Sequence, residues 1–173
     1  MTANNTDKIN LTFSASASKI QKTLILIKPD AMERKLVGQI ISRFEQKGLE
    51  IVGIKMLQMT KELAQKHYAQ HVNKPFYKGL EEFICSRPIV AMVLQGVEAV
   101  EVVRNLVGAT NARKAQPGTI RGDFANSVSS NVVHASDSLE TAEKEIKLFF
   151  NDNELFDKHK PLLQDILYAK DEL

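Results

Sequence analysis

Residues 131–138, which read Asn-Val-Val-His-Ala-Ser-Asp-Ser, carry the strongest chemical signal in the chain. A short β-branched run leads to His134, and the Ser-Asp-Ser cluster after it is typical of the start of a helix. The free backbone N–H groups and the dipole of a helix N-terminus favour anions. The arrangement therefore suits a histidine that attacks a phosphoryl group and carries it. From these residues alone, the alternative is a capped helix preceded by a histidine without a chemical role.

The helix that we expect after His134 contains three glutamates, Glu140, Glu143 and Glu145. Glu145 lies about two turns into this helix. From there its side chain could reach back to the imidazole and hold its tautomer, as a carboxylate does for a catalytic histidine. We expect Glu140 and Glu143 to belong to a solvent-exposed face instead.

Several cations and polar side chains lie where they could bind a polyphosphate. The loop of residues 108–129 and the helix before it contribute Arg104, Thr110, Arg113, Lys114, Arg121 and Asn126. Lys28 ends an apolar strand, where a lysine is costly unless it meets an anion. Tyr68 and Phe76 could stack on a base or on each other. Taken singly, the cations can also be surface charges, and the aromatic residues can be core packing.

Other functional motifs are absent from the sequence. It contains neither G-x-x-x-x-G-K-[ST] nor G-x-G-x-x-G, which excludes a Walker-type P-loop. His67 and His71 have the i, i+4 spacing of a helical zinc site, but the segment H-Y-A-Q-H lacks a glutamate base, so we predict no zinc site from this pair. Cys85, the single cysteine, is expected to be a core thiol.

Hydrophobic periodicity and helix boundary signals predict four strands, at residues 23–28, 49–59, 88–94 and 131–134. Helices are expected at residues 37–47, 60–72, 76–85 and 97–106, and a last one from an Asp137–Glu140 capping box to about residue 150. Gln95-Gly96 is expected to form a turn, and residues 108–129 a long functional loop without secondary structure. This order predicts an α+β protein with the ferredoxin-like βαββαβ fold, a four-stranded antiparallel sheet with helices packed on one face.

Length and composition indicate one globular domain. The chain has 173 residues, of which 43% are hydrophobic and 25% charged, and a formal net charge of +2. Any basic site is therefore local, and no general affinity for nucleic acid or membranes is expected. We divide the chain into a flexible N-terminal extension (1–20), a domain (21–155) and a C-terminal tail (156–173), in which apolar residues recur at helical spacing.

Targeting signals also point away from membranes and secretion. No apolar run reaches the about 18 residues of a membrane span, and residues 1–20 lack the apolar segment of a signal peptide. We interpret the final Lys-Asp-Glu-Leu as a coincidence rather than an endoplasmic-reticulum address. The single cysteine fits a reducing compartment, so a cytoplasmic protein is expected.

Taken together, these features resemble the nucleoside diphosphate kinase family over nearly the whole domain. The matching segments are T-L-I-L-I-K-P-D (23–30), H-Y-A-Q-H (67–71), K-P-F (74–76), G-A-T-N (108–111), P-G-T-I-R-G-D-F (117–124) and N-V-V-H-A-S-D-S (131–138). The resemblance implies that His134 takes the γ-phosphoryl of a nucleoside triphosphate and passes it to a nucleoside diphosphate. Ping-pong kinetics, broad base specificity and maintenance of NTP and dNTP pools follow from that role.

The resemblance also implies roles for other residues. Phosphates and sugar are expected to contact Lys28, Tyr68, Arg104, Thr110, Arg121 and Asn131. Phe76 and Val128 would clamp the base, while Ser136 and Glu145 would orient His134. The implied cofactor is Mg²⁺, held mainly through the nucleotide phosphates and not by a dedicated set of protein ligands. The implied assembly is a homo-oligomer, a tetramer or hexamer, that needs neither nucleic acid nor membrane.

Three positions depart from the family pattern. Ala135 replaces a common glycine after the histidine, and alanine would be strained if the site needed a positive φ. Ala112 replaces a proline, so a more mobile loop and a less stable assembly are expected. Gln70 replaces an acidic residue near the metal, which would weaken metal binding. A binding or scaffold protein without activity and a nucleic-acid-binding protein are the competing interpretations; the matched catalytic positions and the near-neutral charge argue against them.

Overall fold

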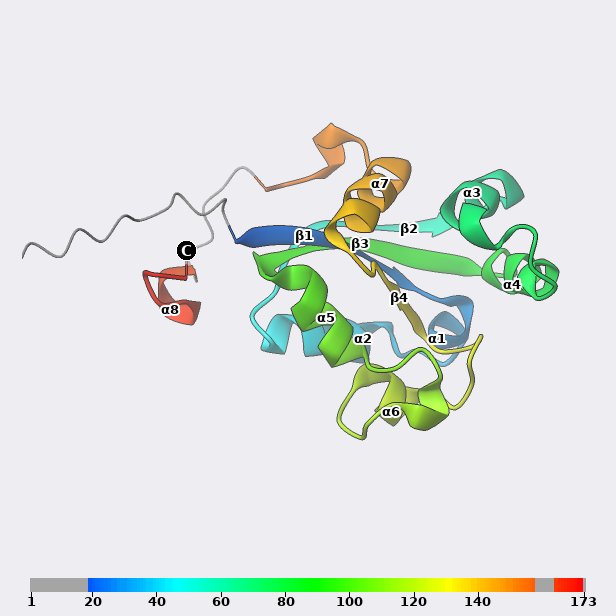
Figure 1. Ribbon diagram of the computed structural model, residues 1–173, viewed down its shortest axis with the longest axis horizontal. Coiled ribbons are helices and arrows are strands. Elements are labelled where there is room, and N and C mark those ends of the chain that lie inside the picture. Colours follow the sequence, from blue (N-terminus) through cyan, green and yellow to red (C-terminus); the bar gives the residue numbers. More distant parts are fainter. Residues whose placement is uncertain (1–18, 158–163, 173) are drawn as a thin grey trace, which may run out of the picture.

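The computed structural model describes residues 19–157 and 164–172. Its centre is a sheet of four strands, β1 (Ile20–Ile27), β2 (Glu50–Gln58), β3 (Pro88–Val97) and β4 (Val133–Ala135), in the order β2-β3-β1-β4. Every neighbouring pair is antiparallel. The α+β, ferredoxin-like prediction is therefore confirmed (Figure 1). Most of the predicted N-terminal extension, and residues 158–163 and 173 of the tail, lie outside the described residues.

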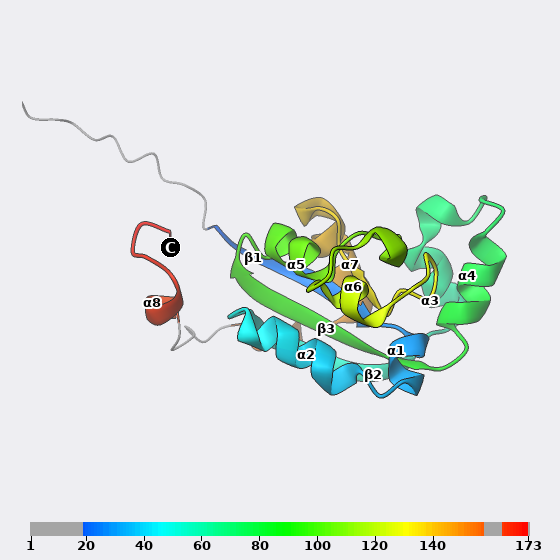
Figure 2. The same cartoon turned by 90° about the horizontal axis from the view of Figure 1, so that it is seen from below.

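The helices cover both faces of the sheet, so the prediction of one covered face was wrong. Ile25 and Ile27 of β1 face a cluster built with α1 (Pro29–Glu33), α2 (Val37–Gln46), α5 (Ala99–Val107) and α6 (Ile120–Phe124). Leu24 and Leu26 face the opposite cluster, built with α3 (Lys61–His67), α4 (Tyr77–Ile84) and α7 (Leu139–Phe149). Figures 1 and 2 show α2 and α5 on one side of the sheet and α7 on the other. Burial of both faces explains why β1 reads as a continuous apolar run.

Several local predictions need correction. Gln95 and Gly96 belong to β3 and form no turn, because Gln95 is buried and donates a hydrogen bond to Glu50. Residues 108–129 contain a 3₁₀ turn (Ala112–Lys114) and α6, which begins where the Thr119 hydroxyl accepts a hydrogen bond from the Gly122 N–H.

The start of α7 also differs from the prediction. Its N-cap is Ser138, whose hydroxyl oxygen accepts from the Thr141 N–H, rather than an Asp137–Glu140 capping box. The predicted helix at residues 60–72 is α3 followed by a 3₁₀ turn, Ala69–His71. The short helix α1 was not predicted.

The described part of the tail forms α8 (Gln164–Leu167), and the Tyr168 hydroxyl accepts a hydrogen bond from the Val97 N–H. None of the helices formed by residues 19–157 and 164–172 has the length and apolar character needed to cross a membrane.

Candidate active site

One cavity of about 580 Å³ collects nearly all the residues that the sequence singled out. Ten of the eleven predicted site residues line it, namely Lys28, Tyr68, Phe76, Arg104, Thr110, Arg121, Val128, Asn131, His134 and Glu145. Ser136, the remaining one, lies behind Glu145 and is fully buried. Gln70, His71 and His67 also line the cavity, and the sequence had not indicated His67 for this site. Residues scattered over most of the chain thus meet where β1 and β4 run side by side.

His134 lies in the centre of β4 and is held by the carboxylate of Glu145. The distance from His134 Nε2 to Glu145 Oε1 is 3.0 Å, and the Ser136 hydroxyl donates to Oε2 at 2.5 Å. The Ser136 oxygen in turn accepts from the Leu24 N–H, which ties this chain of contacts to β1. His134 Nδ1 forms no hydrogen bond with any described residue, so this nitrogen is available for chemistry.

The two other glutamates of α7 behave as expected. Glu140 and Glu143 are exposed, and Glu140 pairs with Lys144 at 2.6 Å. Neither reaches the cavity.

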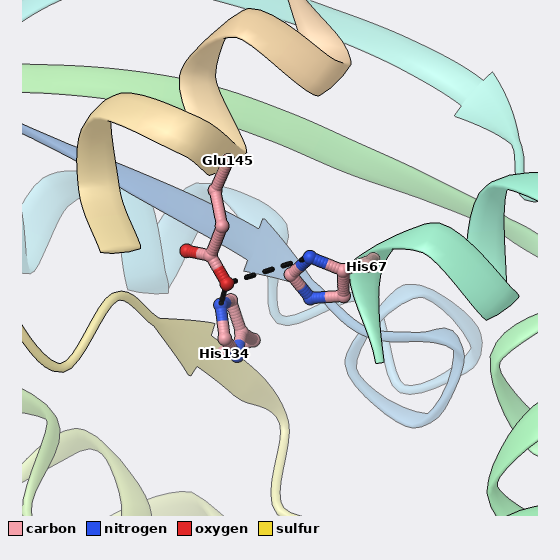
Figure 3. A group of neighbouring side chains, drawn as sticks. All are labelled: His67, His134 and Glu145. Atoms are coloured by element: carbon pink, nitrogen blue, oxygen red, sulfur yellow. Dashed lines mark hydrogen bonds and ion pairs between the residues drawn. The ribbon is translucent and has the colours of Figure 1, made fainter. Parts of the chain in front are cut away.

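His67, which ends α3, shares the carboxylate with His134 (Figure 3). Its Nδ1 lies 3.4 Å from Glu145 Oε1, and its ring centroid is 4.6 Å from that of His134. Burial, reinforced by the neighbouring His134 and Lys28, holds the pKa of His67 well below its ordinary value, so the ring is neutral at pH 7. Sequence reasoning paired His67 with His71 because of their spacing. The helix ends at His67, and only the tertiary fold brings this ring to Glu145.

Lys28 follows β1 and is almost completely buried. Its ammonium donates to Asn131 Oδ1 at 2.7 Å, and the Asn131 amide donates to the carbonyls of Thr110 and Val128, both at 2.8 Å. Burial and the nearby Arg121 lower the pKa of Lys28 to about 8. The ammonium also reaches the Ser129 carbonyl at 3.4 Å, and the nearby Asp30 carboxylate partly offsets the lowering of its pKa. Among the described residues Lys28 forms no ion pair, which leaves it able to stabilise an incoming anion.

Arg121 uses its donors on the protein itself. They reach the carbonyls of Gly108 (2.9 Å), Val133 (2.7 Å) and Asn131 (3.4 Å). Burial and the neighbouring Arg104 lower the pKa of Arg121 to about 10, so it remains a cation at pH 7. The structure therefore gives Arg121 a structural task in addition to the one predicted for it. Arg104, by contrast, makes a single, long hydrogen bond within the described part of the chain, 3.5 Å to the Ala135 carbonyl.

The aromatic and apolar residues separate into two groups. Phe76 and Val128 are exposed, by 55% and 45%, at the mouth of the cavity. Tyr68 is buried and packs edge-on against His67, with centroids 4.4 Å apart, so it does not stack on Phe76. The Tyr68 hydroxyl has no hydrogen-bond partner among the described residues, and burial raises its pKa above the ordinary value.

The positions that depart from the family pattern cause no visible strain. Ala135 does not have a positive φ and pairs with Ile25, so the strain considered for this site is absent. The Ala112 N–H donates to the Ser127 carbonyl at 3.2 Å, a bond that proline could not make. Strain lies instead at Val132, a buried β-branched residue with φ of 62° immediately before β4.

Comparison with known proteins identifies the family of the chain. Residues 21–155 match the profile of the family described as nucleoside diphosphate kinase. The nucleoside diphosphate kinase of Pyrococcus abyssi is 58% identical over 153 residues, which are 87% of this chain and 95% of that protein. That of Rhodopirellula baltica is 52% identical over 88% of this chain and its own whole length.

Two solved structures share the fold. One is a halophilic nucleoside diphosphate kinase from Halobacterium salinarum in complex with CDP (TM-score 0.83, 45% identity, 86% of this chain and 99% of that one). The other is a transition-state mimic of the Borrelia burgdorferi enzyme with vanadate and ADP (TM-score 0.79, 40% identity, 85% of this chain and 96% of that one). On this fold, this cavity and these relatives, the chain belongs to the nucleoside diphosphate kinase family of phosphotransferases.

Proposed function

We propose that this protein transfers the γ-phosphoryl group of a nucleoside triphosphate to a nucleoside diphosphate through a phosphohistidine at His134. The observation that carries the proposal is the orientation of the ring. Its Nε2 is occupied by Glu145 at 3.0 Å, while Nδ1 has no partner in the described residues of the cavity. A neutral imidazole with its proton on Nε2 has its lone pair on Nδ1, the atom that would attack phosphorus.

In the first half-reaction, the Nδ1 lone pair forms a bond to the γ-phosphorus. The bond to the bridging oxygen breaks, and its electron pair leaves with the nucleoside diphosphate. The ring gains positive charge, which the Glu145 carboxylate stabilises through the Nε2–H. In the second half-reaction a terminal oxygen of another diphosphate attacks the same phosphorus, and the N–P electron pair returns to Nδ1. Ping-pong kinetics follow from this order.

Cations in the cavity support the transfer by positioning and charge stabilisation. Lys28, Arg104 and Arg121 line the same cavity as His134. Phosphoryl transfer spreads charge over the non-bridging oxygens, which such cations bind. Thr110 and Asn131 also line the cavity and offer polar contacts to phosphates and sugar.

Phe76 and Val128 are proposed to hold the base between two apolar side chains. Stacking without hydrogen bonds to the base edge discriminates poorly between bases. Broad nucleotide use, and hence a role in maintaining NTP and dNTP pools, is the expected consequence.

Mg²⁺ is proposed to enter with the nucleotide. The carboxylates that line the cavity are Asp137 and Glu145, and both oxygens of Glu145 already accept contacts from Ser136 and His134. Gln70 supplies a neutral amide, so the lining fits a cation held mainly by phosphate oxygens and water. When bound, the ion neutralises phosphate charge.

The assembly is proposed to be a homo-oligomer, a tetramer or hexamer. β2 is an edge strand of the sheet and exposes Ile54 and Met56, by 51% and 67%. An apolar edge strand of this kind favours pairing with another chain. We propose a cytoplasmic location, which the single cysteine supports.

Intact-mass measurement after incubation with MgATP tests the proposal. The wild-type protein should gain one phosphoryl group and lose it when a different nucleoside diphosphate is added. His134→Ala should gain none while still binding nucleotide. Unphosphorylated wild-type protein that still binds ATP would reject the transfer mechanism in favour of a binding or scaffold role.

A further inference from the structure

Two imidazole nitrogens converge on one carboxylate oxygen at the base of the cavity (Figure 3). His134 Nε2 lies 3.0 Å and His67 Nδ1 lies 3.4 Å from Glu145 Oε1. The three ligand atoms lie within 4.8 Å of one another. They come from β4, the end of α3 and the middle of α7, so the fold itself creates the cluster.

The His67 ring packs edge-on against Tyr68 and Phe149, but these contacts leave its two nitrogens without a hydrogen-bond partner among the described residues. The side chain is fully buried. An unpartnered buried polar group costs free energy, so the His67 ring calls for a partner such as a water molecule or an ion.

Two of the three separations, those to Glu145 Oε1, match the coordination shell of a borderline transition-metal ion, and the two imidazole nitrogens lie within 4.8 Å of each other. Zinc binds histidine nitrogen at about 2.0–2.1 Å in a tetrahedron, which places neighbouring ligand atoms about 3.3 Å apart. The two measured contacts to Glu145 Oε1 bracket that value. The other carboxylate oxygen is fixed by Ser136, which would orient this ligand. Three protein ligands would leave the fourth position open to the cavity.

We propose that His67 Nδ1, His134 Nε2 and Glu145 Oε1 form an inhibitory binding site for a divalent transition-metal ion of the zinc class. Mg²⁺, a hard ion that prefers six oxygen ligands, does not suit this set. The site is therefore separate in its ligands from the magnesium that enters with the nucleotide.

Inhibition follows from the tautomer of His134, and this part rests on the proposed function. His134 Nε2 must give up its proton before it can bind a metal. At neutral pH the metal-bound imidazole keeps its single proton on Nδ1, because losing it would leave an imidazolate. Nδ1 then has no lone pair, and the attack on phosphorus is suppressed.

Binding is tested on the full-length protein without nucleotide. Co²⁺ is used as the probe for visible absorption and Zn²⁺ for calorimetry. We expect one ion per chain with the intense d–d bands of tetrahedral Co²⁺, and a loss of affinity of at least about tenfold in His67→Gln. His71→Gln is the matched control, since it removes the next imidazole of the same cavity and should bind as tightly as wild type. Equal affinity in wild type and His67→Gln, or no binding by wild type at millimolar Co²⁺, would overturn the proposal.

Inhibition is tested by the rate of His134 phosphorylation from MgATP at fixed free Zn²⁺. The wild-type rate should fall in proportion to metal occupancy, and the His67→Gln rate, taken relative to its own metal-free rate, should not. An equal fractional loss in both proteins would overturn the inhibitory role. If wild type is not phosphorylated even without Zn²⁺, the proposed transferase function fails while the binding result stands by itself.

Discussion

Glu145→Gln should slow phosphorylation of His134 by about thirtyfold. Glutamine keeps an oxygen that can accept from Nε2 but removes the negative charge. With Nε2 and Oε1 3.0 Å apart, the charge centres are about 4 Å apart, and two full charges at that distance interact by about 4 kcal/mol at an effective dielectric constant of 20. If about half a charge develops on the ring in the transition state, the loss is about 2 kcal/mol, which corresponds to about thirtyfold.

The measurement is a single-turnover rate with radiolabelled γ-phosphoryl nucleotide, quenched in base because phosphohistidine is acid-labile. Glu143→Gln makes the same change on the exposed face of α7 and serves as the control. A loss as large as that of His134→Ala would show that Glu145 does more than orient and stabilise the ring. A loss below about threefold would refute electrostatic stabilisation by this carboxylate.

Three further predictions concern Lys28, Arg121 and Gly108. The pKa of Lys28 is about 8 in the folded protein and 10.5 in its ordinary state, so kcat/KM should fall as pH rises above about 8, and Lys28→Met should lose this pH dependence. Between pH 8 and 10.5 the unfolded state binds more protons than the folded state, so the free energy of unfolding, measured by urea titration, should rise with pH across that window. Arg121→Met should lower the free energy of unfolding by about 3–5 kcal/mol without nucleotide, since three carbonyls lose a buried donor; unchanged stability would leave Arg121 with a phosphate-binding role only. Gly108→Ala should destabilise the protein more than Gly118→Ala. Both glycines have positive φ, but a Cβ at Gly108 would lie 2.4 Å from Thr119 Oγ1, whereas one at Gly118 would meet no atom within 4 Å. Similar melting temperatures for the two variants would contradict the steric argument.

The sequence predicted the strands well because apolar runs bounded by turn residues carry local information. The sequence did not predict α1, because its five residues are too few to show the hydrophobic periodicity of a helix, and it predicted a turn at Gln95 and Gly96. The polar Gln95 is acceptable in a buried strand only because Glu50 of the neighbouring strand accepts its hydrogen bond. The pairing of β2 with β3 brings Glu50 next to Gln95, and the residues around Gln95 in the sequence carry no information about this pairing.

The candidate site was predictable where residue type alone specified chemistry. His134, Lys28 and Glu145 were identified from their places beside a strand end or on a helix. His67 was not, because its neighbours depend on where α3 ends and on how α7 crosses the sheet. Likewise, the use of Arg121 on three backbone carbonyls follows from burial, which no spacing in the sequence signals.

The central position of β1 has a consequence for how the chain is made. One edge of β1 pairs with β4, and the bond between Leu24 and Ser136 joins residues 112 positions apart. At ribosomal rates of about 5–20 residues per second, β4 is synthesised about 6–20 seconds after β1, and this edge of β1 stays unpaired until then. During that interval the nascent chain exposes an unpaired strand edge, which is the kind of surface that leads to aggregation and that chaperones protect.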